Sequence, residues 1–181
     1  MLWVGEPRGE PYPKLDEGNS TLSRMDEIAI QFAVERLQAR YVACIDDDRL
    51  EEWPAFFAER CRYQIISNEN YSRKLPIAVF VATSQGMLKD RVAALREANI
   101  YEAQRYRHLV SSTLILENVG GVVRAQSNYH VVRIMQDGAT ALFSTGRYLD
   151  CINLTGATPV FEEKLVICDS RRIDTLLAIP L

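Results

Sequence analysis

The chain has 181 residues, of which 48% are hydrophobic and 25% charged, and its formal net charge is −3. This length fits one domain with a core of its own. A slightly acidic chain lacks the basic stripe that a general nucleic-acid binder needs to neutralise phosphates. No apolar run reaches the ~18 residues needed to cross a membrane, and the first residues do not resemble a secretory signal. We therefore expect a cytoplasmic protein that binds neither nucleic acid nor membrane.

The cysteines are widely spaced and form no C-x-x-C motif, so neither a zinc ribbon nor a thioredoxin-like centre is indicated. Reduced, half-buried thiols are the expected state. The cysteines are Cys44, Cys61, Cys151 and Cys168.

The N-terminal part of the chain divides into a tail and a helix. Residues 1–22 are rich in proline and glycine and have no apolar period, which predicts a tail. We expect a single α+β domain over 23–181. Apolar residues recur at three- and four-residue steps over 24–45, which predicts a long amphipathic helix.

A second, shorter helix is predicted through WPAFF (53–57). Asp48 followed by Glu51 resembles a capping box. Trp53, Phe56 and Phe57 give this helix a large aromatic face, and we expect Trp53 and Phe57 to be core anchors.

The remaining elements are mostly strands. Short strands are predicted at 62–67 and 77–82, and Ser84 can cap a third helix that follows. Turn residues such as Gly120-Gly121 and Asp137-Gly138 then separate four long strands. These strands are predicted at 109–117, 122–135, 139–152 and 160–167. Helices followed by an antiparallel meander predict an α+β fold, and long twisted strands around a long helix predict a cone-like half-barrel.

The strand at 139–152 carries large apolar groups on both faces, which is unusual for a sheet with one solvated face. Two explanations remain open. A partner chain could cover the second face, or bulges could switch the faces of a curved sheet.

The two histidines, His108 and His130, lie near each other if the chain turns at Gly120-Gly121. In one register they share a face, and a one-residue slip places them on opposite faces. No short motif supplies the carboxylate that a two-histidine iron site would also need. Hydrogen-bonded or interface histidines are the favoured interpretation.

A small acid–base site could be built from Tyr41, Tyr63 and Asp46, with His108 or His130 as the base. No spacing singles these residues out, so core tyrosines are the favoured alternative.

Basic groups gather around His108, where Arg105 and Arg107 precede it and Arg133 lies on the neighbouring strand. Such a patch could pair with acids of a partner chain, or it could form ion pairs within the fold. We single out Arg105, Arg107 and His108 as a candidate partner interface, and we identify no catalytic, cofactor-binding or metal-binding residue.

Several segments resemble the small, or β, subunit of aromatic-ring-hydroxylating dioxygenases. These segments are LEEWPAFFAERCRYQI (50–65), LKDRVAALREANIYEAQRYRHLVSS (88–112), GRYLDCI (146–152) and LVICDSRRIDTLLAIPL (165–181). The resemblance covers about residues 25–181, and it is strongest to the terephthalate dioxygenase and salicylate 5-hydroxylase branches. One departure is Lys164, which stands where many relatives carry arginine.

The resemblance implies the cone fold of nuclear transport factor two and the ketosteroid isomerases. It also implies a mainly structural subunit without a cofactor, which assembles with a large subunit, usually three of each. In such enzymes the large subunit carries a Rieske [2Fe–2S] cluster and a mononuclear iron. Electrons arrive from a reductase, in some systems through a ferredoxin.

The number of histidines in the chain agrees with a small subunit that holds neither iron centre. A Rieske centre takes two histidines and a facial-triad iron takes two more, whereas the chain has only two. The competing hypothesis is a stand-alone cone-fold isomerase or dehydratase acting on a small cyclic substrate.

Overall fold

The computed structural model describes residues 21–97, 102–170 and 179–181, and their side chains from residue 26 onward. Nearly all of the predicted tail therefore lies outside the described residues. The long predicted helix is present as α1, Thr21–Asp46.

A curved, six-stranded sheet forms the body of the molecule, in the order β2-β1-β6-β5-β4-β3. The strands are β1 (Phe57–Ser67), β2 (Phe80–Ser84), β3 (Gln104–Val119), β4 (Val122–Met135), β5 (Thr140–Asn153) and β6 (Val160–Cys168). The predicted antiparallel meander is confirmed for β3 to β6. One pairing was not predicted: β1 lies parallel to β6. Turn residues in the sequence indicate only pairings between strands that are consecutive in the chain. They therefore give no sign that the first strand pairs with the last.

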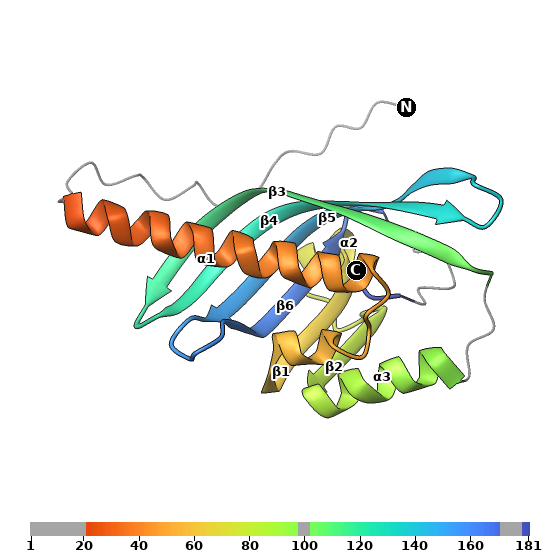
Figure 1. Cartoon of the computed structure of the whole chain (residues 1–181), viewed down its shortest axis with the longest axis horizontal. Coiled ribbons are helices and arrows are strands. Elements are labelled where there is room, and N and C mark those ends of the chain that lie inside the picture. Colours follow the sequence, from red (N-terminus) through yellow and green to blue (C-terminus); the bar gives the residue numbers. More distant parts are fainter. Residues whose placement is uncertain (1–20, 98–101, 171–178) are drawn as a thin grey trace.

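Helix α1 lies across one face of the sheet (Figure 1), which we call the inner face. Its buried stripe includes Val34, Leu37 and Tyr41. On β4, Val123 and Tyr129 are buried toward α1, whereas the alternate residues are mostly exposed or half-buried on the opposite, outer face. The residues of β4 therefore alternate between a buried inner face and a more exposed outer face.

The mixed pattern on β5 has a local cause. The register between β4 and β5 shifts at Val131 and Val132. Beyond this bulge Leu142 is 65% exposed, while the neighbouring Phe143 lies 4.9 Å from the guanidinium of Arg133. The bulge hypothesis thus accounts for the large groups near residue 142.

The capping-box prediction at Asp48 is wrong. The backbone of Asp48 has φ +58°, and its carboxylate accepts hydrogen bonds from Arg96 at 3.0 Å. Glu51 binds the same guanidinium at 2.8 Å. Both carboxylates are therefore engaged across the fold, and residues 53–56 form only a single 3₁₀ turn, η1 (Trp53–Phe56).

Helix α3 (Gln85–Glu97) lies beside the β1–β2 edge (Figure 1). As predicted, Ser84 caps it: its Oγ accepts a hydrogen bond from the backbone N–H of Met87 at 3.3 Å. The predicted strand at 77–82 is shorter, since β2 begins at Phe80. A small helix, α2 (Asn68–Ser72), was not predicted.

An aromatic cluster closes the core near η1. Trp53 is fully buried and Phe57 is 1% exposed, which confirms both as core anchors. Their rings meet edge to face with centroids 5.6 Å apart, and Tyr63 lies 5.2 Å from Trp53. Such edge-on pairs are the favoured arrangement of aromatic rings.

Candidate functional site

A polar cluster lies buried between α1 and the sheet. Lys164 on β6 and Asp150 on β5 are directly opposed in the antiparallel register, and their side chains form an ion pair at 3.2 Å with no exposed surface. Gln38 on α1 completes the cluster. Its amide nitrogen donates to Asp150, and its oxygen accepts from Lys164 at 3.0 Å.

Three aromatic rings surround the Lys164 ammonium. Its Nζ lies 3.7 Å from the ring centroid of Tyr148, 4.5 Å from that of Phe161 and 4.6 Å from that of Tyr41. Ring faces attract a cation most strongly where water is excluded. The rings and the Asp150 carboxylate therefore hold a charge in a place where an isolated charge would be very unfavourable.

Burial shifts the protonation of both partners. It lowers the pKa of Lys164 to about 8, although the negative charge of Asp150 opposes that shift. Burial likewise raises the pKa of Asp150, against the effect of Lys164. Removal from water thus outweighs the mutual attraction in each case.

The cluster of Gln38, Asp150 and Lys164, which we call the Lys164 cluster, was not predicted from the sequence. A signal was available, because Asp150 lies between two core positions, Tyr148 and Ile152, in the period-two pattern of β5. A charged residue on the buried face of an alternating strand indicates that a buried partner neutralises it.

A second buried pair joins the end of α1 to β3. Nδ1 of His108 lies 2.6 Å from Asp46 Oδ1, and the backbone N–H of His108 donates to Asp46 Oδ2 at 2.9 Å. The His108 side chain is fully buried. Its Nε2 has no hydrogen-bond partner among the described residues. Of the predicted acid–base group, the fold pairs Asp46 with His108 and separately brings Tyr41 and Tyr63 together at the carbonyl oxygen of Leu181.

The other candidates lie elsewhere. His130 is exposed on the outer face, whereas His108 faces inward, so the two histidines cannot share a metal. Tyr41 and Tyr63 both donate their hydroxyl to the carbonyl oxygen of Leu181, at 2.8 and 3.0 Å. These two tyrosines are therefore core residues that hold the 179–181 segment, and burial raises the pKa of both.

The arginines predicted as a patch are separated by the sheet. Arg105 and Arg107 are exposed, and Arg107 lies 3.8 Å from Asp46 while keeping 63% of its side chain in solvent. Arg133 is half-buried over the ring of Phe143. Of these basic residues, Arg105 and Arg107 have exposed side chains, and His108, which follows Arg107, is buried.

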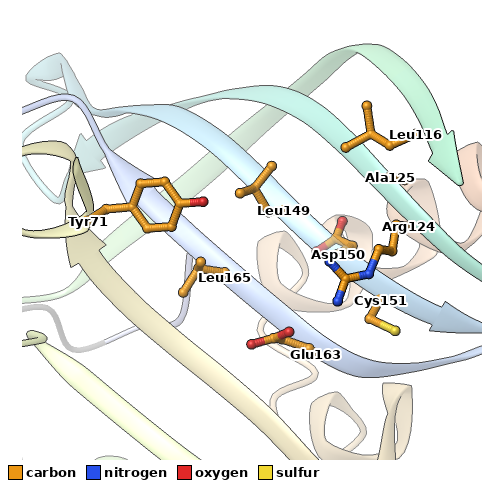
Figure 2. Close-up of a pocket in the computed structure, with 9 residues that line it drawn as sticks. All are labelled: Tyr71, Leu116, Arg124, Ala125, Leu149, Asp150, Cys151, Glu163 and Leu165. Carbon is orange, nitrogen blue, oxygen red and sulfur yellow. The ribbon is translucent and has the colours of Figure 1, made fainter. Parts of the chain in front are cut away.

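Three connected cavities hollow the outer face of the sheet, and we call them the outer groove. Their volumes are about 160, 400 and 530 Å³, and all three are lined by Glu163. Figure 2 shows the smallest, with Tyr71 at one end and Arg124, Cys151 and Glu163 at the other. Leu149 and Leu165 form its floor between them.

Within 21–97, 102–170 and 179–181, no three His, Cys, Asp or Glu side chains come together in a way that could hold a metal ion. The same ranges contain no helix that is long and apolar enough to cross a membrane.

Comparison with solved structures first defines the fold class of the chain. A protein from Novosphingobium aromaticivorans that is named as a scytalone dehydratase superposes with a TM-score of 0.62 at 17% identity, and the match covers 82% of this chain and 88% of that one. At that identity the likeness shows the fold alone. The predicted cone-shaped α+β fold is therefore confirmed.

More similar proteins identify the family. A structure named as the β subunit of an aromatic-ring-hydroxylating dioxygenase, also from N. aromaticivorans, matches with a TM-score of 0.79 and 41% identity over 87% of this chain and 99% of that one. The small subunit of anthranilate 1,2-dioxygenase from Burkholderia cepacia is 39% identical over 86% of this chain and 97% of its own length. The β1 subunit of the terminal oxygenase component of terephthalate 1,2-dioxygenase from a Comamonas species is 37% identical, over 83% and 98%.

The family model for the ring hydroxylating beta subunit matches residues 40–175. The chain belongs to this family, and it is the β subunit of an aromatic-ring-hydroxylating dioxygenase. The resemblance seen in the sequence is thereby confirmed, and a stand-alone isomerase or dehydratase is not favoured.

Proposed function

We propose that the chain is a non-catalytic, mainly structural subunit of a terminal oxygenase, in which a large subunit carries both the Rieske cluster and the mononuclear iron. The observation that carries this proposal is the match to an anthranilate dioxygenase small subunit over 97% of its length. The chain's two histidines support it, because the two iron centres together take four. Three copies of each subunit, a reductase and in some systems a ferredoxin complete the proposed cytoplasmic system.

The proposed substrate is an aromatic carboxylic acid. Two relatives above 35% identity are named for anthranilate and terephthalate, and both compounds are benzene rings that bear a carboxylate. The substrate would bind in the large subunit, so the small subunit would contribute only to the stability and geometry of that site.

Reconstitution tests this assignment. The chain is co-expressed with the Rieske-type large subunit of the same organism, and oxygen uptake with benzoate-type acids is compared among the complex, the large subunit alone and this chain alone. We expect turnover only when the large subunit is present, and faster or longer-lived turnover when both are. Turnover by this chain alone would refute a non-catalytic role.

We propose further that the strand start around Arg105 and Arg107 contacts the large subunit. Both arginines lie in solvent, while the buried Asp46–His108 pair fixes the backbone beneath them through the bond from the His108 N–H. A rigid, doubly basic strand is suited to pair with carboxylates of a partner, and planar guanidinium groups bind carboxylates in a bidentate manner.

The double substitution Arg105→Ala with Arg107→Ala tests this interface, and Arg36→Ala with Lys89→Ala is the matched control on exposed helix faces. We expect weaker co-elution with the large subunit for the first variant only, while its circular dichroism and melting temperature stay those of the wild type. Undiminished assembly would refute the interface. Unfolding of the isolated variant would show instead that the arginines act within the fold.

A further inference from the structure

Gln64 carries an unpaired hydrogen-bond donor in the outer groove. The residue is only 6% exposed, and it lies on the outer face of β1, since its neighbours Tyr63 and Ile65 are buried in the core. Its Oε1 accepts two hydrogen bonds from Arg62, at 3.0 Å from Nε and 2.5 Å from Nη2, so the amide nitrogen points away from that guanidinium. The nitrogen donates to no residue in the described part of the chain. A largely buried donor without a partner is unfavourable, so this position favours a ligand that accepts from it.

Gln64 lines the largest cavity of the outer groove, which has a volume of about 530 Å³. This size falls within the range of about 300–1,000 Å³ that is usual for small-molecule sites. Residues of β1, β6 and α2 line it together with the segment 74–81. The side chain of Asn70 donates to the carbonyl oxygen of Ile77 at 3.0 Å, and the backbone N–H of Leu75 donates to the carbonyl oxygen of Asn70 at 2.9 Å. The wall of the cavity is therefore held in place by the fold itself.

Positive charge exceeds negative charge in this cavity. Arg62 and Lys74 line it, and Glu163 is the one carboxylate among its described lining residues. Arg62 lies 3.7 Å from Glu163 and remains 56% exposed, whereas Lys74 forms no ion pair within the described ranges. The backbone of Lys74 has φ +54°, in a position after α2 where glycine is the usual residue. A lysine is thus present where its backbone is strained, and its ammonium group is left available.

Apolar side chains form the rest of the cavity. Ile66 and Leu165 lie on the neighbouring strands β1 and β6. Leu75 and Val81 line it from the 74–81 segment and are 38% and 40% exposed, and Tyr71 adds an aromatic ring. Apolar surface with a few convergent polar groups is typical of small-molecule sites. The apolar walls favour a ring, while the guanidinium, ammonium and amide donors favour a carboxylate.

We propose that this cavity binds a small aryl carboxylate. The carboxylate would accept hydrogen bonds from the amide of Gln64 and lie between the charges of Arg62 and Lys74. The ring would lie on Ile66 and Leu165. The site goes beyond the proposed function, because all of its residues belong to this chain and binding to it needs no large subunit.

Titration of the full chain with benzoate, followed by the NMR signals of side-chain amides, tests the site. We expect saturable, one-to-one binding that shifts the Gln64 signals, which are identified by their absence in Gln64→Leu. Benzamide has a similar shape and no charge, and it should bind at least about tenfold more weakly, because hydrogen bonds to a charged group are the stronger ones. No saturable binding, equal binding of benzamide, or binding that leaves the Gln64 signals unmoved would overturn the proposal.

Two substitutions change the charge of the cavity in opposite directions. Lys74→Gly removes a cation and suits the local backbone, because glycine adopts positive φ freely. We expect it to weaken benzoate binding at least about tenfold. Glu163→Gln removes the carboxylate that pairs with Arg62, and it should strengthen binding severalfold.

Lys89→Ala, on the exposed face of α3, is the matched control and should bind benzoate as the wild type does. Each variant is first checked for a native circular dichroism spectrum. Equal affinity of Lys74→Gly and the wild type, or weaker binding by Glu163→Gln, would overturn the site. These outcomes do not depend on the large subunit, so they separate this inference from the proposed function.

Discussion

Replacing Lys164 by methionine should strongly destabilise the fold. The substitution keeps an unbranched side chain of similar length but removes the cation that pairs with Asp150, whose side chain is fully buried. Gln38 would then be the one remaining polar partner identified for that carboxylate. Removing one member of a buried pair typically costs about 3–5 kcal/mol, because the other charge is left without compensation. We expect that loss for Lys164→Met at pH 7.

The matched control removes the whole cluster. In the triple variant Gln38→Leu, Asp150→Leu and Lys164→Met, no polar group of the cluster itself is left without a partner. Apolar replacement of a complete buried network is often neutral or stabilising by about 1–4 kcal/mol. We therefore expect the triple variant to recover most of the stability that the single variant loses.

The stability of both variants is measured by urea unfolding, followed by circular dichroism and by tryptophan fluorescence. If Lys164→Met keeps wild-type stability, or if the triple variant is no more stable than the single one, the ion pair is not what holds α1 to β5 and β6.

Two further predictions concern the same core. The pKa of Lys164 lies at about 8 in the folded chain, below the ~10.4 of an exposed lysine. Between these values the unfolded chain binds more protons, so stability should rise with pH, by at most about 1.4 kcal/mol per pH unit. Urea titrations from pH 7.5 to about 9.5 should show this rise in the wild type and not in Lys164→Met; parallel curves would contradict it. Phe57→Ala, at a site 1% exposed, should lower the free energy of unfolding by about 3–5 kcal/mol, whereas an unchanged melting temperature would mean that the aromatic cluster is not a core.

Much of the fold follows from local signals. The hairpin between β3 and β4 turns at Gly120 and Gly121, both with positive φ, and such glycine turns can be recognised from the sequence. The apolar period of α1 likewise predicts its buried face. Asp48 was misread because its carboxylate binds Arg96, a residue far away in the chain, and no pattern of neighbours reveals that bond.

The candidate sites were less predictable for the same reason. The Asp46–His108 contact depends on how the end of α1 meets β3, and the Lys164 cluster depends on the register of β5 against β6. Pairing of His108 with an internal acid was one of the alternatives left open by the sequence. The outer groove is lined by residues of all six strands and of α2, so no single segment indicates it.

We propose that this chain holds no metal centre and completes an oxygenase in which a large subunit holds both iron centres. The most direct test is iron analysis and visible absorbance of the co-purified complex and of each subunit after separation. We expect all iron and all absorbance of the [2Fe–2S] cluster to stay with the large subunit, while this chain alone is colourless. A stoichiometric cluster on the isolated chain, or a complex that never forms, would contradict it.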